Sequence, residues 1–179
     1  MKYCIECGSE LILKENFNCG VSEGMVPYCP SCNQFRFPQF NTSVSMVVFN
    51  KDFSKILLIQ QYNKGVNILV AGYVSKGDNL EQTIKRELKE EVNLDILSFK
   101  YNESSYFEKT NSLICNFIVQ SASEDFTLNP EVDYAQWYDI ETAKKVIYQN
   151  SLAQYFMLKA IDKVQTQPVW LTLVNQNNR

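Results

Sequence analysis

The chain has 179 residues, 45% of them hydrophobic and 13% aromatic, which is enough for one main core and a small appendage. Its net charge of −3 argues against nucleic acid as a partner but is compatible with a nucleotide-sized substrate. No run reaches the roughly 18 apolar residues of a membrane span, the N-terminus lacks the core of a signal peptide, and the lack of histidine excludes histidine-based catalysis. We therefore expect a cytoplasmic protein that does not bind membranes.

Most of the cysteines lie near the start of the chain. Two pairs, each with a two-residue spacer, are separated by 21 residues: Cys4, Cys7, Cys29 and Cys32. This spacing is typical of a structural zinc site with four thiolates. Disulfides or redox thiols are the alternatives, but disulfides fit poorly with a cytoplasmic chain and a redox pair needs no second pair. Cys19 and Cys115 are predicted to be small apolar residues or free thiols.

Several segments have strand character. Within residues 1–36, the ranges 10–14 and 24–28 are expected to pair as short strands of a zinc ribbon, which metal binding would stabilise because so small a unit buries little apolar surface. Apolar and β-branched runs predict further strands at 43–50, 55–61, 66–70, 97–107, 113–120 and 133–139.

Helical spacing returns near the end of the chain. Residues 141–165 are predicted to form one helix, or two helices broken near Asn150. The C-terminal tail, residues 166–179, has an apolar patch at 169–174 that either docks or frays. The order of strands, helix, strands and helix predicts an α+β fold with a mixed sheet between helices.

The most informative stretch is 72–94, GYVSKGDNLEQTIKRELKEEVNL. Asp78 or Asn79 can cap a helix, and a glutamate or glutamine three residues on can complete a capping box. An apolar stripe at four-residue steps predicts an amphipathic helix through Leu80, Ile84 and Leu88. Asn93 tolerates the left-handed conformation that ends a helix.

Three carboxylates crowd one side of this predicted helix. Glu87 and Glu91 lie one turn apart, and Glu90 lies about 60° round from Glu87. Carboxylates grouped in this way suit a hard cation such as Mg²⁺. The alternative interpretation is a solvated acidic face, which charge runs commonly form.

The glycine-containing loop, the predicted helix and the helix end at Asn93 together resemble the Nudix box. The matching positions, all in register, are Gly72, Arg86, Glu87, Leu88, Glu90, Glu91 and Leu94. At two positions the sequence departs from the pattern. Asp78 stands where the family has glutamate and keeps the charge on a shorter arm, whereas Asn93 stands where the family has glycine and keeps the turn.

A zinc ribbon directly before such a domain resembles the NADH pyrophosphatase family and its zinc-ribbon relatives. The residues that match the family's link between the two parts are Arg36, Phe37 and Pro38. The resemblance implies a Nudix α/β/α sandwich over residues 37–165, preceded by the zinc ribbon over residues 1–36.

The resemblance also implies roles for site residues. Glu87 and Glu91 would be the central ligands of Mg²⁺ or Mn²⁺, with Glu90 joining them or handling the water. The carbonyl of Ala71 would complete the shell. Arg86 would orient the glutamates, although a simple surface ion pair is the alternative.

A further acidic residue usually comes from beyond the box, near a tryptophan on a later strand. Glu131 is the expected donor here, with a solvated turn residue as the alternative, whereas Tyr134 stands where relatives often carry glutamate. The family's substrate signature is kept in part, and the candidate substrate-binding residues are Ser104, Tyr106, Phe107 and Ser112. The aromatic pair can stack on a base or be ordinary strand residues. Because the signature's prolines and tryptophan are missing, NADH specificity does not carry over.

The sequence thus predicts a Mg²⁺- or Mn²⁺-dependent hydrolase with a structural zinc. The expected substrate is a nucleoside diphosphate linked to another group, of the ADP-ribose, NADH or FAD type. The rival is a non-catalytic module that senses a nucleotide or uses the ribbon to bind protein or nucleic acid. The departures at Asp78 and Tyr134 favour the rival, and the ribbon could also build a homodimer.

Overall fold

The computed structural model describes residues 1–166, so the predicted tail beyond Thr166, with its apolar patch, lies outside the described residues. The chain divides into two compact units, Met1–Phe40 and a second that begins at Asn41. Within residues 1–166, no helix is long and apolar enough to cross a membrane.

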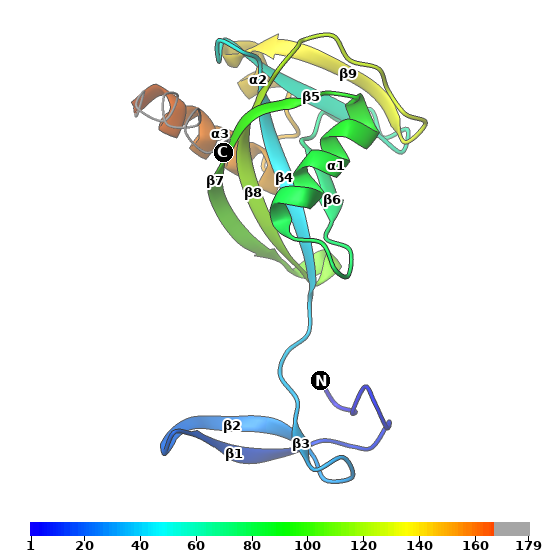
Figure 1. Ribbon diagram of the computed structural model, residues 1–179, viewed down its shortest axis with the longest axis vertical. Helices are drawn as coiled ribbons and strands as arrows, with labels where there is room; N and C mark the ends of the chain where they lie inside the picture. Colours follow the sequence, from blue (N-terminus) through cyan, green and yellow to red (C-terminus); the bar gives the residue numbers. More distant parts are fainter. Residues whose placement is uncertain (167–179) are drawn as a thin grey trace, which may run out of the picture. The chain divides into compact units, whose positions relative to one another are not determined.

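The first unit is built on a small antiparallel sheet (Figure 1). Its strands, in spatial order, are β1 (Ile12–Asn18), β2 (Val21–Cys29) and β3 (Gln34–Phe35). Both strands predicted for the ribbon are present and are longer than expected. The buried apolar side chains of this unit are those of Cys4 and Cys29. Apolar burial therefore contributes little to its stability.

The second unit is built on a six-stranded mixed sheet. Its strands are β4 (Asn41–Phe49), β5 (Lys55–Gln61), β6 (Val70–Tyr73), β7 (Ile96–Phe107), β8 (Ser112–Ser121) and β9 (Val132–Asp139). The order is β7-β8-β4-β5-β9, with β6 paired to β4 outside this path. β4 and β8 are parallel, whereas the other pairs are antiparallel. A 3-10 turn, Glu108–Thr110, joins β7 to β8.

The strand predicted at 66–70 is displaced toward the C-terminus and spans Val70–Tyr73. Asn67 and Ile68 make only isolated bridges, to Ile147 and Ile59, and the strand proper, β6, begins at Val70. The reason is the partner: β4 offers its edge to residues 70–73. The prediction was therefore wrong by several residues, and the correct strand contains Gly72.

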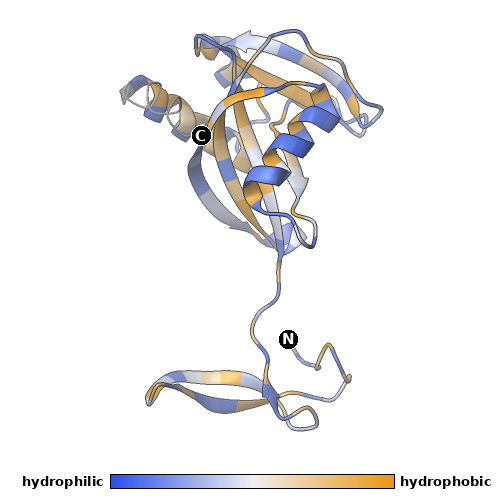
Figure 2. Ribbon diagram, viewed as in Figure 1, coloured by the Kyte–Doolittle hydropathy of each residue, from blue (hydrophilic) through white to orange (hydrophobic). Residues whose placement is uncertain are grey.

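Helices cover both faces of the sheet (Figure 1). They are α1 (Leu80–Val92), α2 (Ile140–Val146) and α3 (Leu152–Thr166). Successive side chains of β4 point alternately into two hydrophobic cores. One core contains Val44, Met46 and Val48 packed with α1. The other contains Val47 and Phe49 packed with α2 and α3. Figure 2 shows the apolar strands between these layers. The expected α+β sandwich with a mixed sheet is confirmed.

Local sequence signals set the ends of the helices. Asn79, rather than Asp78, caps α1, and its side chain accepts from the Gln82 N–H in a complete capping box. Asn93 ends α1 in the left-handed conformation at φ 54°. The predicted break near Asn150 separates α2 from α3, and Asn150 also has a positive φ, 56°.

Candidate active site and metal centres

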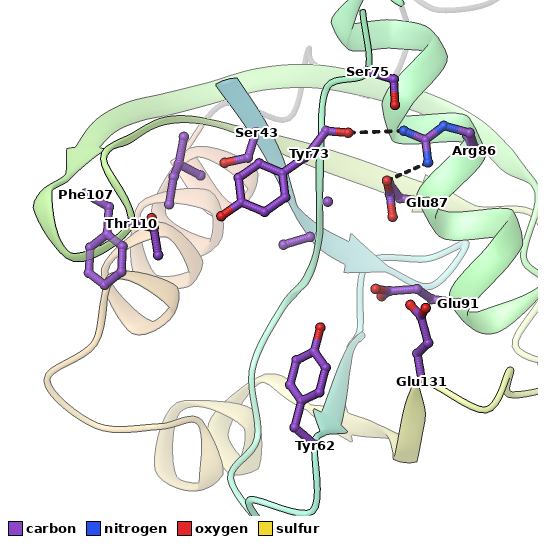
Figure 3. Close-up of a pocket in the computed structure, with 13 residues that line it drawn as sticks. Ser43, Tyr62, Tyr73, Ser75, Arg86, Glu87, Glu91, Phe107, Thr110 and Glu131 are labelled. Carbon is purple, nitrogen blue, oxygen red and sulfur yellow. Dashed lines mark hydrogen bonds and ion pairs between the residues drawn. The ribbon is translucent and has the colours of Figure 1, made fainter. Parts of the chain in front are cut away.

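The box helix borders a cavity of about 520 Å³ (Figure 3). It is formed by the start of β4, the end of β5, β6, α1, the β7–β8 turn and the residue before β9. Its lining residues are Ser43, Tyr62, Ala71, Gly72, Tyr73, Ser75, Arg86, Glu87, Glu91, Phe107, Thr110, Ile114 and Glu131. Carboxylates from two elements, α1 and the approach to β9, therefore face one space.

Gly72 lets Glu87 reach this cavity. A Cβ added at Gly72 would lie 1.9 Å from the Glu87 carboxyl carbon, so no other residue fits beside the carboxylate as it stands. The Glu87 side chain is 13% exposed. Burial raises its pKa, and the neighbouring Arg86 guanidinium opposes that effect. Gly72 thus leaves the space that the Glu87 carboxylate occupies.

Glu91 is the most buried carboxylate of the site, at 4% exposure. Its Oε1 accepts a hydrogen bond of 2.8 Å from Gln61 Nε2, whereas its buried Oε2 has no partner among the described residues. Burial raises the pKa of Glu91 to about 7, with Glu87 and Glu131 adding to the effect. A buried carboxylate oxygen without a donor is costly unless a cation or a ligand satisfies it.

Arg86 holds several acidic groups together. Its Nη1 donates to Glu87 Oε1 at 2.7 Å and to Glu90 Oε2 at 3.2 Å, and its Nη2 donates to the Tyr73 carbonyl. Asp78 Oδ2 lies 3.6 Å from Arg86 Nε. This arrangement is more than a simple surface ion pair, because it ties the loop, β6 and α1 to one guanidinium. Figure 3 shows the bonds of Arg86 to Tyr73 and Glu87.

The other predicted catalytic and metal residues divide into two groups. Ala71 and Glu131 line the cavity, and Figure 3 shows the Glu131 carboxylate next to Glu91. Glu90 is not a lining residue, since its side chain is 55% exposed and pairs with Arg86. The geometry thus brings together Glu87, Glu91 and Glu131 and leaves Glu90 at the edge.

The predicted substrate-binding residues are mostly elsewhere. Phe107 lines the cavity, whereas Ser104 and Tyr106 are exposed and absent from its lining. The Tyr106 hydroxyl donates to Asn111 Oδ1 at 2.7 Å, and the buried Ser112 hydroxyl donates to the Thr110 carbonyl. Successive strand residues point to opposite faces, so Tyr106 and Phe107 cannot both face the site.

Sequence reasoning missed several residues of the site, among them Gln61, Tyr62 and Tyr73. Gln61 reaches Glu91 across 30 positions of sequence, and Tyr62 and Tyr73 contribute aromatic side chains to the lining. Tyr73 directly follows the box glycine, so its position was a usable signal. Nothing in the local sequence marks Gln61, because its role depends on a strand and a helix meeting.

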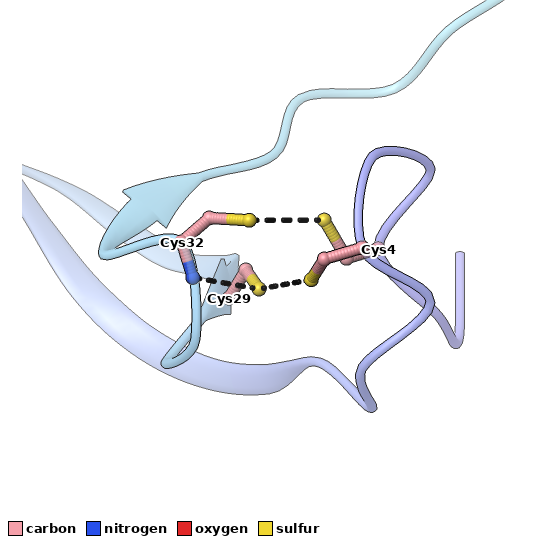
Figure 4. Close-up of side chains that lie close together, drawn as sticks. Cys4, Cys29 and Cys32 are labelled. Carbon is pink, nitrogen blue, oxygen red and sulfur yellow. Dashed lines mark hydrogen bonds between the residues drawn. The ribbon is translucent and has the colours of Figure 1, made fainter.

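The four predicted zinc ligands also come together, and Figure 4 shows Cys4, Cys29 and Cys32 among them. The Sγ atoms of Cys4, Cys7, Cys29 and Cys32 all lie within 4.8 Å of one another. Cys4 and Cys32 are 3.9 Å apart and Cys7 and Cys29 3.5 Å apart, so neither pair is a disulfide. A tetrahedral zinc with bonds of about 2.3 Å needs sulfurs at roughly this spacing. The four thiols therefore fit zinc.

Arg36 supports this cluster from the predicted link. Arg36 is 8% exposed, and its Nε donates to Cys4 Sγ at 3.3 Å while its Nη2 pairs with Glu6 at 2.7 Å. That hydrogen bond lowers the pKa of Cys4 to about 6. Cys32 shows the opposite behaviour, since its contact with Cys7 raises its pKa to about 12. The Arg36 guanidinium therefore stabilises a thiolate at Cys4.

A model of the NUDIX domain matches residues 39–158, which is more than half of the chain. The chain belongs to the NUDIX family. The two Nudix box positions that depart from the pattern keep their structural roles, because Asp78 lies within ion-pair distance of Arg86 and Asn93 ends the helix. Tyr134 is exposed and is not among the residues that line the cavity.

Comparisons with individual proteins agree with the family. An NAD-capped RNA hydrolase NudC from Stutzerimonas stutzeri is 27% identical over 87% of this chain and 54% of its own length. The NudC of Vibrio atlanticus is 26% identical over 94% of this chain and 61% of its own length. The chain thus spans little more than half the length of these curated relatives.

Solved structures share the fold. A NUDIX hydrolase from Nitrosomonas europaea has a TM-score of 0.61 at 20% identity, covering 94% of this chain and 93% of its own. The NUDIX domain of Shewanella oneidensis NrtR, solved with ADP ribose, has a TM-score of 0.61 at 18% identity, covering 76% of this chain and 94% of its own. At these identities the likeness concerns the fold alone.

A divalent cation such as Mg²⁺ or Mn²⁺ is implied by the Nudix family, and this chain offers carboxylates for one along a single cavity. Glu87, Glu91 and Glu131 supply carboxylate oxygens, the ligands that Mg²⁺ prefers. The buried Oε2 of Glu91 has no hydrogen-bond partner among the described residues. It is independent support for a cation at this site, because a cation would satisfy it.

Proposed function

We propose that the chain is a Mg²⁺- or Mn²⁺-dependent hydrolase that cleaves the diphosphate of a nucleoside diphosphate linked to another moiety. The carrying observation is the cavity in which Glu87, Glu91 and Glu131 converge beside Arg86. A diphosphate is negatively charged and would be repelled by these carboxylates alone. Glu87, Glu91 and Glu131 would hold a cation, which would neutralise that charge and supply activation of the attacking water.

The chain's own residues prepare this site. Gln61 fixes Glu91 through one carboxylate oxygen and leaves the other available. Arg86 fixes Glu87 from the side, so the two glutamates keep their orientations without a substrate. Because the two carboxylates are already oriented, binding and reaction require less reorganisation of the site.

The shape of the cavity supports a substrate with a second bulky group. An apolar recess of about 280 Å³ shares Ser43, Ala71, Phe107 and Ile114 with the main cavity and extends toward α3. Its size and apolar walls suit a planar ring. Together with the NAD-capped RNA hydrolases among the relatives, this supports substrates of the NADH, FAD or ADP-ribose type.

The zinc ribbon is proposed to be structural. Its four thiols converge on one point and the unit buries little apolar surface, so zinc would contribute much of its folding free energy.

The test is turnover of ADP-ribose, NADH and FAD with Mg²⁺ or Mn²⁺. Native protein should cleave at least one of them, and Glu91→Gln should reduce kcat/KM by roughly a hundredfold or more. Glu81→Gln is the matched control, because Glu81 is an exposed residue of the same helix outside the cavity lining. Binding of these nucleotides without hydrolysis would favour the sensing module instead.

A further inference from the structure

The turn that follows β5 contains an unexpected residue. Tyr62 and Asn63 have φ values of 59° and 52°, and the Lys64 N–H donates to the Gln61 carbonyl at 3.4 Å. Two successive positive φ values closed by this bond are typical of a type I′ turn, whose central positions favour Asn, Asp and Gly. Asn63 suits its position. Tyr62 does not, because a bulky side chain is strained in the left-handed region.

The turn has anchors other than the aromatic ring, whose centroid lies 5.4 Å from Lys64 Nζ. Its anchors lie on either side of Tyr62, where Gln61 bonds to Glu91 and the Asn63 N–H donates to Asp133 Oδ2 at 2.6 Å. Tyr62 itself is 68% exposed, so its ring buries little surface. Packing therefore does not explain why a strained tyrosine stands at this position.

The ring does, however, face the cavity. Tyr62 is a lining residue, and Figure 3 shows its side chain pointing into the same space that Glu91 and Glu131 face. It does not line the apolar recess, which opens on the side of Phe107. The carboxylate site thus has the recess on one side and the Tyr62 ring on another.

We propose that the ring of Tyr62 is a specificity-determining contact on which a planar base of the substrate stacks, outside the apolar recess. This inference rests on the proposed function, since it names the contact for a second ring in the same substrate. An exposed aromatic face can stack on any base. Two ring sites flanking the carboxylates would favour dinucleotides over compounds with a single base.

Replacing Tyr62 should change ligand binding and thermal stability in opposite directions. Tyr62→Asn should raise the Tm, because asparagine tolerates the left-handed turn position. The same change should weaken NADH binding by about 5- to 150-fold, the effect of losing one base–aromatic stack. ADP-ribose, which has one base, should lose less. Tyr62→Phe should recover most of the lost affinity without the gain in Tm.

The experiment measures Tm, KM and Kd for native protein and these variants. Dissociation constants for NADH and ADP-ribose come from calorimetry, and Tyr148→Asn serves as the control, because Tyr148 is an exposed tyrosine outside the cavity lining. Unchanged NADH affinity in Tyr62→Asn would overturn the proposal. So would equal losses in the Phe and Asn variants, which would assign the effect to the hydroxyl.

Calorimetry also keeps this test distinct from that of the proposed function. If native protein binds nucleotides without cleaving them, the hydrolase proposal fails, and the ratio of native to Tyr62→Asn affinity still decides the role of Tyr62. If native protein neither binds nor cleaves any of them, both proposals fall.

Discussion

Replacing Gly72 with alanine should inactivate the protein without unfolding it. The new Cβ would lie 1.9 Å from the Glu87 carboxyl carbon, whereas ordinary contacts begin near 3.4 Å. The carboxyl carbon must therefore move by about 1.5 Å. A misplacement of about 1 Å can cost roughly a hundredfold in rate. We expect kcat/KM to fall by about that factor or more.

The stability of this variant should change little. Gly72 has no positive φ, so alanine suits its strand conformation. Alanine in place of a strand glycine gains about 0.5–1 kcal/mol, largely through the unfolded state. Displacing Glu87 from Arg86 loses a hydrogen bond worth about 1 kcal/mol. The two effects nearly offset each other, and a Tm change of no more than about 4 °C is expected.

The assay pairs turnover of the best substrate with thermal unfolding. Gly77→Ala is the control in the loop that follows β6, because a Cβ there meets nothing within 4 Å but the residue has a φ of +101°. That control should lose Tm and keep Glu87 in place. In a Glu87→Gln background, Gly72→Ala should add little further loss. Full activity of Gly72→Ala, or additive losses with Glu87→Gln, would refute the steric reasoning.

Two further predictions concern the supporting residues. Gln61→Leu removes the hydrogen bond that orients Glu91 and should weaken Mg²⁺ affinity about 10- to 100-fold, seen as a shift in the Mg²⁺ dependence of the rate; an unshifted curve would contradict this. Cys29→Ser should abolish stoichiometric zinc binding and make residues 1–40 protease-sensitive while the second unit keeps its Tm. Mass spectrometry and limited proteolysis measure both effects, and retention of one zinc per chain would contradict the four-thiol site.

Much of the architecture follows from local sequence signals. Asn79 and Asn93 mark the ends of α1 because capping involves only residues one turn apart. The cysteine pairs predicted a four-thiol cluster because their spacing is typical of such sites, and the thiols do converge. The break at Asn150 and the amphipathic stripe of α1 belong to the same class of short-range pattern.

The prediction of the strand at 66–70 failed because strand pairing decides the outcome. The strand expected at 66–70 became β6 at 70–73, since only the partner edge of β4 selects which residues pair. A bulge in β7 between Tyr101 and Glu103 sets which later side chains face the cavity. A shift of one residue reverses the faces of a strand, and sequence alternation alone does not locate the bulge.

The sequence by itself determined the identity and order of the chemical groups: four thiols, an arginine and a helix carrying carboxylates at fixed angles. These are properties of covalent order and helical period. The tertiary structure decided which groups share a space. It placed Glu131 beside Glu91, Glu87 against Gly72, Gln61 on Glu91 and the ring of Tyr62 at the cavity. The reason is that these contacts join elements far apart in the chain, and only the packing of the sheet against its helices fixes their distances.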